Sequence, residues 1–277
     1  MPFSLPSLNY RAVRVGRVNR KQGVAFATMN KETLGVRVTE GEGSLPKVVL
    51  TSAGGSEAEL YLFGGCVTSW KASNDKDLLF VRPDAVFNKK KPIRYCYLSF
   101  VRCSSIMSFL AVILRKQHGF ARNMDWSILD SENVEGNPVI TLELKDGPYS
   151  RAMWDFSFRA LFKVILNTKS ISTELTITNT DNKPFSFSSA LHTYFRASVT
   201  GASVKGLKGC KTLNKDPDPK NPMEGKEESW SDAVLWNPHL QMEACYKDFV
   251  CVENAKIGKV QLEPEQSWTA KQHLSIN

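Results

Sequence analysis

The stretch ISTELTITNT, residues 171–180, decides the fold class of this 277-residue chain. Its apolar Leu175 and Ile177 alternate with the polar Glu174 and Thr176. Successive side chains of a strand point to opposite faces of a sheet, so the alternation predicts a strand with one buried and one solvent-facing side. Strands of this kind are typical of antiparallel sheets packed on a core.

Similar short segments recur from residue 34 onward, separated by turn sequences such as SAGGSE (52–57) and SENVEGNP (131–138). They predict strands at 47–52, 58–63, 77–81, 139–146, 155–166, 171–180, 184–196, 248–254, 258–263 and 267–275. The sequence shows neither a long helical period nor strands alternating with helices. We therefore expect an all-β chain, with one antiparallel sandwich or barrel domain over residues 34–277.

The composition, 42% hydrophobic and 23% charged residues, is typical of a soluble globular protein. The net charge of +8 comes from two acid-free segments, 1–29 and 95–116. A nucleic-acid-binding protein would place its positive charge on the folded face that contacts the nucleic acid, so we expect no such partner. The apolar run IMSFLAVIL (106–114) is too short to span a bilayer, and we expect no membrane partner.

The leader, residues 1–33, is basic and poor in structural signals. This pattern is similar to an organelle transit peptide, although Ser4 and Ser7 are its only serines. The alternative is a disordered basic tail. The six cysteines form no C-x-x-C pair and have no zinc-site spacing, which favours reduced intracellular thiols and no bound metal.

One of only four histidines lies in the segment 184–196. The two-residue period places Phe187 and Leu191 on an apolar face, and His192 beside Ala190 on a small, polar face. From the residues alone, His192 is either a structural histidine or half of an acid/base pair.

The same period places Cys251 and Glu253 on one face of the segment 248–254. A carboxylate partly buried in an apolar strand suits a general base, because burial disfavours its charged form. The alternative is a solvent-exposed glutamate at a strand end, since NAKIG (254–258) is typical of a turn.

Arg122 follows a Gly-Phe turn, and Arg94 closes the basic loop NKKKPIR (88–94). Two arginines can bind a phosphate through forked, charge-assisted hydrogen bonds. Ordinary surface arginines are the alternative.

Six segments occur together in one order: YLFGGCVTSW (61–70), DLLFVRPDAVF (77–87), QHGFARN (117–123), HTYFR (192–196), AVLWNP (233–238) and FVCVENA (249–255). With them the chain resembles the plant-type glucose-6-phosphate 1-epimerases, or hexose-phosphate mutarotases, of the aldose-1-epimerase-like group. The resemblance covers about 34–94 and 115–275. It implies the antiparallel supersandwich of the galactose mutarotase type. It also favours the plastid as destination of the leader, with the cytoplasm as the alternative.

The resemblance implies that His192 is the general acid and Glu253 the general base. It implies substrate contacts from Arg94, Gln117 and Arg122. The implied reaction is the interconversion of the α and β anomers of glucose 6-phosphate by a monomeric isomerase that needs no metal or other cofactor. The alternative function is a non-catalytic protein that binds carbohydrates or sugar phosphates on the same scaffold.

The resemblance breaks in two places. Residues 95–114 replace a Gly-Gly-Ile-Pro segment that lines the sugar pocket in the family. A block of strands also looks absent near residue 229, between Glu228 and Trp230. We interpret the first as an alternative transcript segment, or else as a divergent insertion that packs as a strand or helix. Because lost strands expose sheet edges and core faces, we expect impaired activity.

Overall fold

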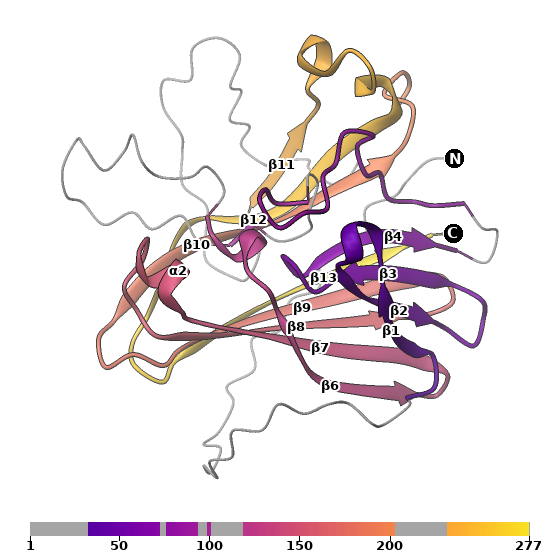
Figure 1. Ribbon diagram of the computed structural model, residues 1–277. Helices are drawn as coiled ribbons and strands as arrows, with labels where there is room; N and C mark the ends of the chain where they lie inside the picture. Colours follow the sequence, from indigo (N-terminus) through magenta and orange to yellow (C-terminus); the bar gives the residue numbers. More distant parts are fainter. Residues whose placement is uncertain (1–32, 73–75, 94–98, 101–118, 203–231, 277) are drawn as a thin grey trace.

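The computed structural model describes residues 33–72, 76–93, 99–100, 119–202 and 232–276 (Figure 1). Several predictions fall outside these ranges. They are the leader up to residue 32, the predicted substrate contacts Arg94 and Gln117, the atypical segment apart from residues 99–100, and the junction near residue 229.

The described residues form three antiparallel sheets. The first has the order β1 (Val36–Glu40), β2 (Pro46–Thr51), β3 (Glu57–Tyr61) and β4 (Cys66–Lys71). The second has the order β11 (Asp232–Trp236), β12 (Phe249–Leu262), β10 (Phe185–Arg196) and β5 (Ser99–Phe100). The third has the order β13 (Ser267–Ser275), β9 (Ser170–Asn179), β8 (Phe158–Leu166), β7 (Asn137–Lys145) and β6 (Ser127–Val134).

Helical structure in the described residues is limited to short turns. These are the α-helix α2 (Pro148–Arg151) and the 3₁₀ turns η1 (Glu42–Ser44), η2 (Ala121–Asn123), η3 (His239–Met242) and η4 (Tyr246–Asp248). None of these helices has the length and apolarity needed to cross a membrane. The all-β, antiparallel fold class is thereby confirmed.

The three sheets enclose one large apolar core. In Figure 1 the five-stranded sheet forms the lower layer, β1–β4 lie against it, and β10, β11 and β12 rise above both. The core draws on all three sheets, with Trp70 from β4, Phe162 from β8 and Phe187 from β10 each almost fully buried. Burial of a large apolar side chain stabilises the fold by about 1.5–3 kcal/mol. The core therefore holds the sheets against one another.

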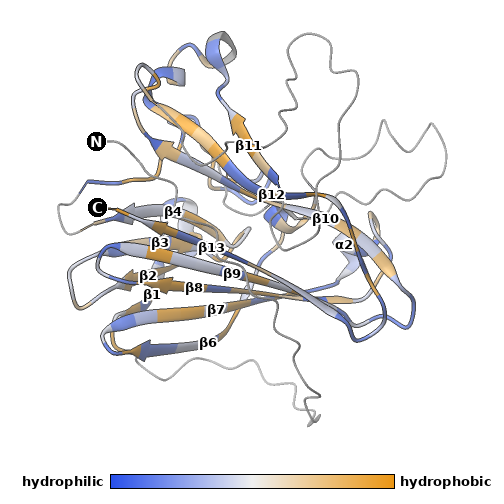
Figure 2. Cartoon of the chain, turned by 180° about the vertical axis from the view of Figure 1, so that it is seen from behind, coloured by the Kyte–Doolittle hydropathy of each residue, from blue (hydrophilic) through white to orange (hydrophobic). Residues whose placement is uncertain are grey.

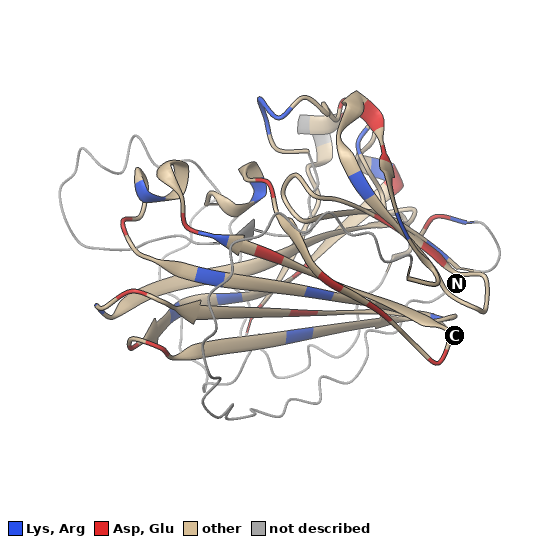
Figure 3. Ribbon diagram, turned by 60° about the horizontal axis from the view of Figure 1, so that its bottom comes forward, with Lys and Arg blue, Asp and Glu red and all other residues tan. Residues whose placement is uncertain are grey.

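The alternation read from residues 171–180 is confirmed in β9. Leu175 and Ile177 are fully buried, whereas Glu174 and Thr176 lie on the outer face. That outer face carries charges of both signs, which Figure 3 shows interspersed along the strands. Cross-strand ion pairs link Lys271 to Glu174 (2.7 Å) and Arg159 to Glu143 (2.6 Å).

Some strand predictions were wrong. The predicted strands 248–254 and 258–263 are one continuous strand, β12, so NAKIG is not a turn. The segment 77–81 forms isolated bridges instead of a strand, and part of SENVEGNP belongs to β6. The strands β1, β4, β6 and β11 were not predicted. β4 is buried on both faces and β1 is largely exposed, so neither gives the alternating pattern.

Candidate active site

His192 and Glu253 face each other across two paired strands. In the register of β10 and β12, His192 lies directly opposite Glu253. Directly opposite residues of an antiparallel pair project from the same face of the sheet. His192 Nε2 lies 3.2 Å from Glu253 Oε1. The strand pairing thus brings together an imidazole and a carboxylate that are far apart in the sequence.

The position of β12 inside its sheet fixes the backbone of Glu253. β12 lies between β10 and β11, and Glu253 is paired with His192 on one side and Val234 on the other. The side chains of His192 and Glu253 are only 14% and 10% exposed. Glu253 is therefore not the solvent-exposed strand-end glutamate that was one interpretation of the sequence.

Cys251 adds a third polar atom to this pair. It precedes Glu253 by two residues on β12, so the two side chains share a face. Its Sγ donates to Glu253 Oε1 at 3.5 Å and lies 3.8 Å from His192 Nδ1. Burial raises the pKa of the Cys251 thiol well above its ordinary value, and the nearby Glu253 carboxylate raises it further. Cys251 is consequently a neutral hydrogen-bond donor to the carboxylate.

Aromatic rings support the pair from one side. Tyr194, two residues from His192, contacts the imidazole edge-on, with ring centroids 5.9 Å apart. The Tyr194 ring stacks on Phe249 at 4.6 Å and on Trp236 of β11 at 6.0 Å. Figure 2 shows mainly apolar residues where β11 pairs with β12. Tyr194 is buried, so the face that carries His192 is partly aromatic and not simply small and polar.

Arg122, one of the two arginines predicted to bind the substrate, does not lie on β10 or β12. Arg122 belongs to the 3₁₀ turn η2, which follows Gly119, a glycine with φ of +67°. η2 contacts β5, and β5 pairs with β10 at Ser189 and Ala190. Arg122 therefore lies on a turn next to the sheet that carries His192. Arg94 and Gln117 are outside the described residues, so their positions relative to the pair stay predictions.

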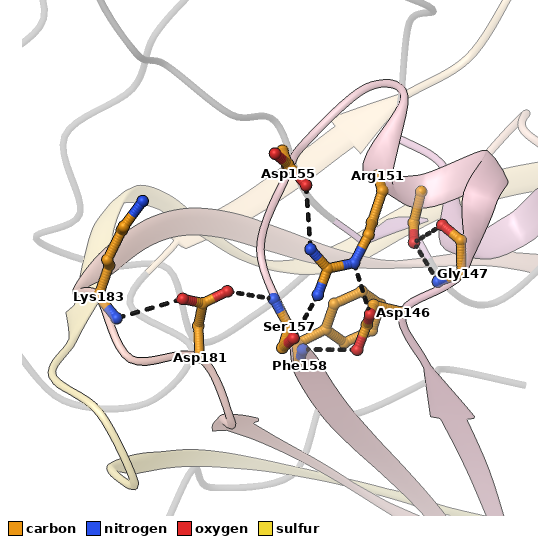
Figure 4. A network of polar contacts seen from close by, with 9 residues as sticks. Asp146, Gly147, Arg151, Asp155, Ser157, Phe158, Asp181 and Lys183 are labelled. Carbon is orange, nitrogen blue, oxygen red and sulfur yellow. Dashed lines mark hydrogen bonds and ion pairs between the residues drawn. The ribbon is translucent and has the colours of Figure 1, made fainter.

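A second polar region lies far from this pair. A solvent-open hollow of about 370 Å³ is bordered by Arg151, Ser157 and Asp181. Figure 4 shows that its lining residues bind one another: Arg151 pairs with Asp155 at 3.0 Å, and the Asp181 carboxylate accepts a hydrogen bond from the backbone N–H of Ser157 at 2.7 Å. The hollow lies at the turn before β10, which begins at Phe185, and His192 is about 23 Å further along that strand at 3.3 Å per residue. Arg151, Asp155 and Asp181 satisfy one another and the neighbouring backbone, so we assign this network a structural role.

The sequence profile of the family described as "Aldose 1-epimerase" matches residues 46–216, more than half of the chain. The chain belongs to the aldose 1-epimerase family. The family is of the isomerase class, acts in carbohydrate metabolism and binds sugar substrates. The matched range includes His192 and ends before Glu253.

Individual relatives agree with this assignment. A curated plant protein from Cenchrus ciliaris, named "Putative glucose-6-phosphate 1-epimerase", is 31% identical over 83% of this chain and 84% of its own length. The crystal structure of YeaD from Salmonella typhimurium, a protein given the name mutarotase, superposes on this chain with a TM-score of 0.71. The two chains are 20% identical, and the superposition covers 89% of this chain and 95% of YeaD. The crystal structure of a galactose mutarotase-like protein from Clostridium acetobutylicum superposes with a TM-score of 0.60 at 12% identity. The superposition covers 87% of this chain and 98% of that protein. These two likenesses show the galactose mutarotase-like fold.

Two residues of the site were not predicted from the sequence. The two-residue period places Cys251 on the face of Glu253 but gives it no role, and its contact with His192 depends on strand register. Trp236 lies on β11, a strand that the sequence did not reveal. The two-residue spacing of Cys251 and Glu253 is the signal that could have identified the cysteine.

Proposed function

We propose that this chain interconverts the α and β anomers of glucose 6-phosphate, with Glu253 as general base and His192 as general acid. The observation that carries the proposal is the 3.2 Å contact between His192 Nε2 and Glu253 Oε1 at facing positions of β10 and β12. An anomerase needs one proton acceptor and one proton donor within reach of the same sugar carbon, and this pair supplies both.

The proposed reaction opens and recloses the sugar ring. Glu253 accepts the proton of the C1 hydroxyl while His192 donates a proton to the ring oxygen, and the bond between C1 and the ring oxygen breaks. The resulting aldehyde turns about the bond between C1 and C2. Closure on its other face returns both protons, so the protein ends in its starting state. Each such group typically contributes about 10²–10⁴-fold to the rate.

The surroundings of the pair suit this chemistry. Nε2 of His192 lies within hydrogen-bond distance of the Glu253 carboxylate, at 3.2 Å from Oε1, so the two groups can reach the same substrate atoms. The thiol of Cys251 and the ring of Tyr194 restrict the two side chains to few orientations. Fixed geometry matters because a catalytic group contributes fully only when it is already aligned with the reacting atoms.

We propose that Arg94, Gln117 and Arg122 hold the substrate, with the arginines on the 6-phosphate. A guanidinium binds phosphate through paired, charge-assisted hydrogen bonds. Support comes from the name of the Cenchrus ciliaris relative and from the position of η2 beside β5. We further propose a monomer that needs no cofactor and is located in the plastid, with the leader as its targeting segment.

The two departures from the family pattern lead us to propose a reduced rate. By the family resemblance, residues 95–114 and the junction near residue 229 stand where the family has walls of the sugar pocket, while the sequence retains His192 and Glu253. A turnover number equal to that of family members with complete walls would contradict this part of the proposal.

Anomer exchange of glucose 6-phosphate, followed by NMR with the full chain, tests the function. The second candidate is a sugar-phosphate binding protein without catalysis. A chain that binds glucose 6-phosphate in calorimetry but shows no exchange above the buffer rate would favour that alternative.

A further inference from the structure

The cluster of His192, Cys251 and Glu253 brings together three atom types that ligate transition metals. Imidazole nitrogen, thiolate sulfur and carboxylate oxygen are the usual zinc ligands in proteins. One ligand atom from each of the three residues lies within 4.8 Å of the others. From these observations we infer that the cluster binds a divalent ion of the zinc type.

The distances within the cluster resemble those of a tetrahedral site. Zinc bonds of about 2.0–2.3 Å give edges of about 3.3 Å between nitrogen and oxygen and about 3.5 Å between sulfur and oxygen. His192 Nε2 lies 3.2 Å from Glu253 Oε1, and Cys251 Sγ lies 3.5 Å from the same oxygen. The remaining pair, the sulfur and an imidazole nitrogen, lies within 4.8 Å, and Nδ1 of the same ring is 3.8 Å from Cys251 Sγ.

The backbone holds the ligands in place. Cys251 and Glu253 share one face of β12, and His192 projects from the facing position of β10. All three side chains are largely buried, and the site needs no loop movement to assemble. Ligands on paired strands are more precisely positioned than ligands on loops.

The donor set selects the type of ion. Magnesium and calcium require six or more oxygen ligands, whereas this cluster offers one carboxylate. A sulfur and a nitrogen ligand favour zinc and other transition-metal ions that prefer thiolate and imidazole ligands. Binding replaces the thiol proton of Cys251 with the metal and releases that proton, without oxidation or reduction. Three protein ligands leave the fourth tetrahedral position for water or a sugar hydroxyl.

The consequence for activity rests on the proposed function. An ion bound by Nε2 of His192 and Oε1 of Glu253 occupies the lone pairs that would exchange protons with the sugar. Zinc would therefore inhibit anomer exchange by blocking the acid/base pair. Metal binding itself does not depend on the reaction and can be measured separately.

Cobalt(II) is the spectroscopic probe for this site. We expect the full chain, purified without a histidine tag and freed of metal, to show tetrahedral cobalt absorption in the visible and a thiolate-to-cobalt charge-transfer band. The chain has six cysteines, so the decisive measurement is the variant Cys251→Ala, which should lose the band. The matched control Cys245→Ala changes another buried cysteine and should keep it.

A second measurement does not need a thiol signal. Zinc should raise the melting temperature of the wild-type chain, because a ligand that binds the folded state stabilises it. Removing one ligand by His192→Gln should weaken cobalt binding by about tenfold or more, since even outer-shell partners of a metal site change affinity by 10–100-fold. Circular dichroism of each variant confirms that it is folded.

The results separate the two proposals. A charge-transfer band that persists in a folded Cys251→Ala variant, or octahedral cobalt absorption alone in the wild type, would overturn the metal site. Cobalt binding without any sugar exchange would support the metal site and refute the proposed function. Exchange activity that zinc leaves unchanged, together with no cobalt band, would support the function and refute the metal site.

Discussion

His192 and Glu253 occupy facing positions on β10 and β12, with Nε2 and Oε1 3.2 Å apart and both side chains largely buried. This single relationship turns two strand residues into a donor–acceptor pair on one face of a sheet.

Substitution of His192 by Gln should slow the exchange of glucose 6-phosphate anomers by about 10²–10⁴-fold, measured as the rate above that of buffer alone. The reason is that the proton donor to the ring oxygen is lost. The matched control is His273→Gln, which changes an exposed histidine on β13 that bonds Ser172. Exchange NMR measures the anomer exchange rate with each variant. Equal rates for His192→Gln and wild type would show that His192 is a structural histidine.

Substitution of Arg122 by Gln should raise the KM for glucose 6-phosphate. A hydrogen bond to a charged group is worth about 1.5–3 kcal/mol, which corresponds to roughly 10–150-fold. Exchange of unphosphorylated glucose should change much less. Arg159→Gln, on the outer face of β8, is the control and should leave both substrates unaffected. A similar loss for both sugars in Arg122→Gln would argue against a phosphate contact.

The alternation along β9 predicts opposite outcomes at neighbouring positions. Leu175→Ala removes a fully buried side chain and should lower the free energy of unfolding by about 2–5 kcal/mol. Glu174→Gln breaks only the surface ion pair with Lys271 and should cost at most about 1 kcal/mol. Urea denaturation measures the free energy of unfolding of both variants. Equal effects at the two positions would contradict the assignment of faces.

Acid should weaken the turn that precedes β10. Hydrogen bonds from the backbone N–H groups of Ser157, Asn182 and Lys183 hold the pKa of Asp181 below its ordinary value of 3.8. The unfolded chain then binds a proton more readily than the folded one. The contribution to stability is present above pH 3.8 and is lost as the pH falls through the lower pKa of the folded state.

Urea midpoints between pH 2 and pH 6 test this pH dependence. Asp181→Asn should destabilise the fold near neutral pH and flatten the acid limb of the stability curve. Asp155→Asn, a more exposed carboxylate of the same network, should have little effect because surface ion pairs contribute little. An acid limb of unchanged slope in Asp181→Asn would refute the prediction.

Much of the fold could be predicted from the sequence because half-buried strands leave a period of two. This held for β9 and β10, where Leu175, Ile177 and Leu191 are buried as expected. It failed for β4, which is buried on both faces, and for β11, whose residues alternate poorly. The burial of such strands depends on the strands and loops that pack against them, and the alternation of residues within the strand does not show it.

The site was predictable only in part. Alternation alone left His192 and Glu253 as separate candidates with structural alternatives, and the family resemblance joined them. The register of β10 and β12 then placed them at facing positions. The contacts of Cys251 depend on the same register, and because residues 197–248 separate β10 from β12, no hairpin turn between the two strands reveals it.

The most direct test of the account is the rate of glucose 6-phosphate anomer exchange with the full chain, wild type against Glu253→Gln, by two-dimensional exchange NMR. Circular dichroism and calorimetric binding of the sugar phosphate confirm that the variant is folded and binds. We predict exchange above the buffer rate with the wild type and exchange at the buffer rate with Glu253→Gln. A Glu253→Gln variant that exchanges the anomers as fast as the wild type would contradict the account.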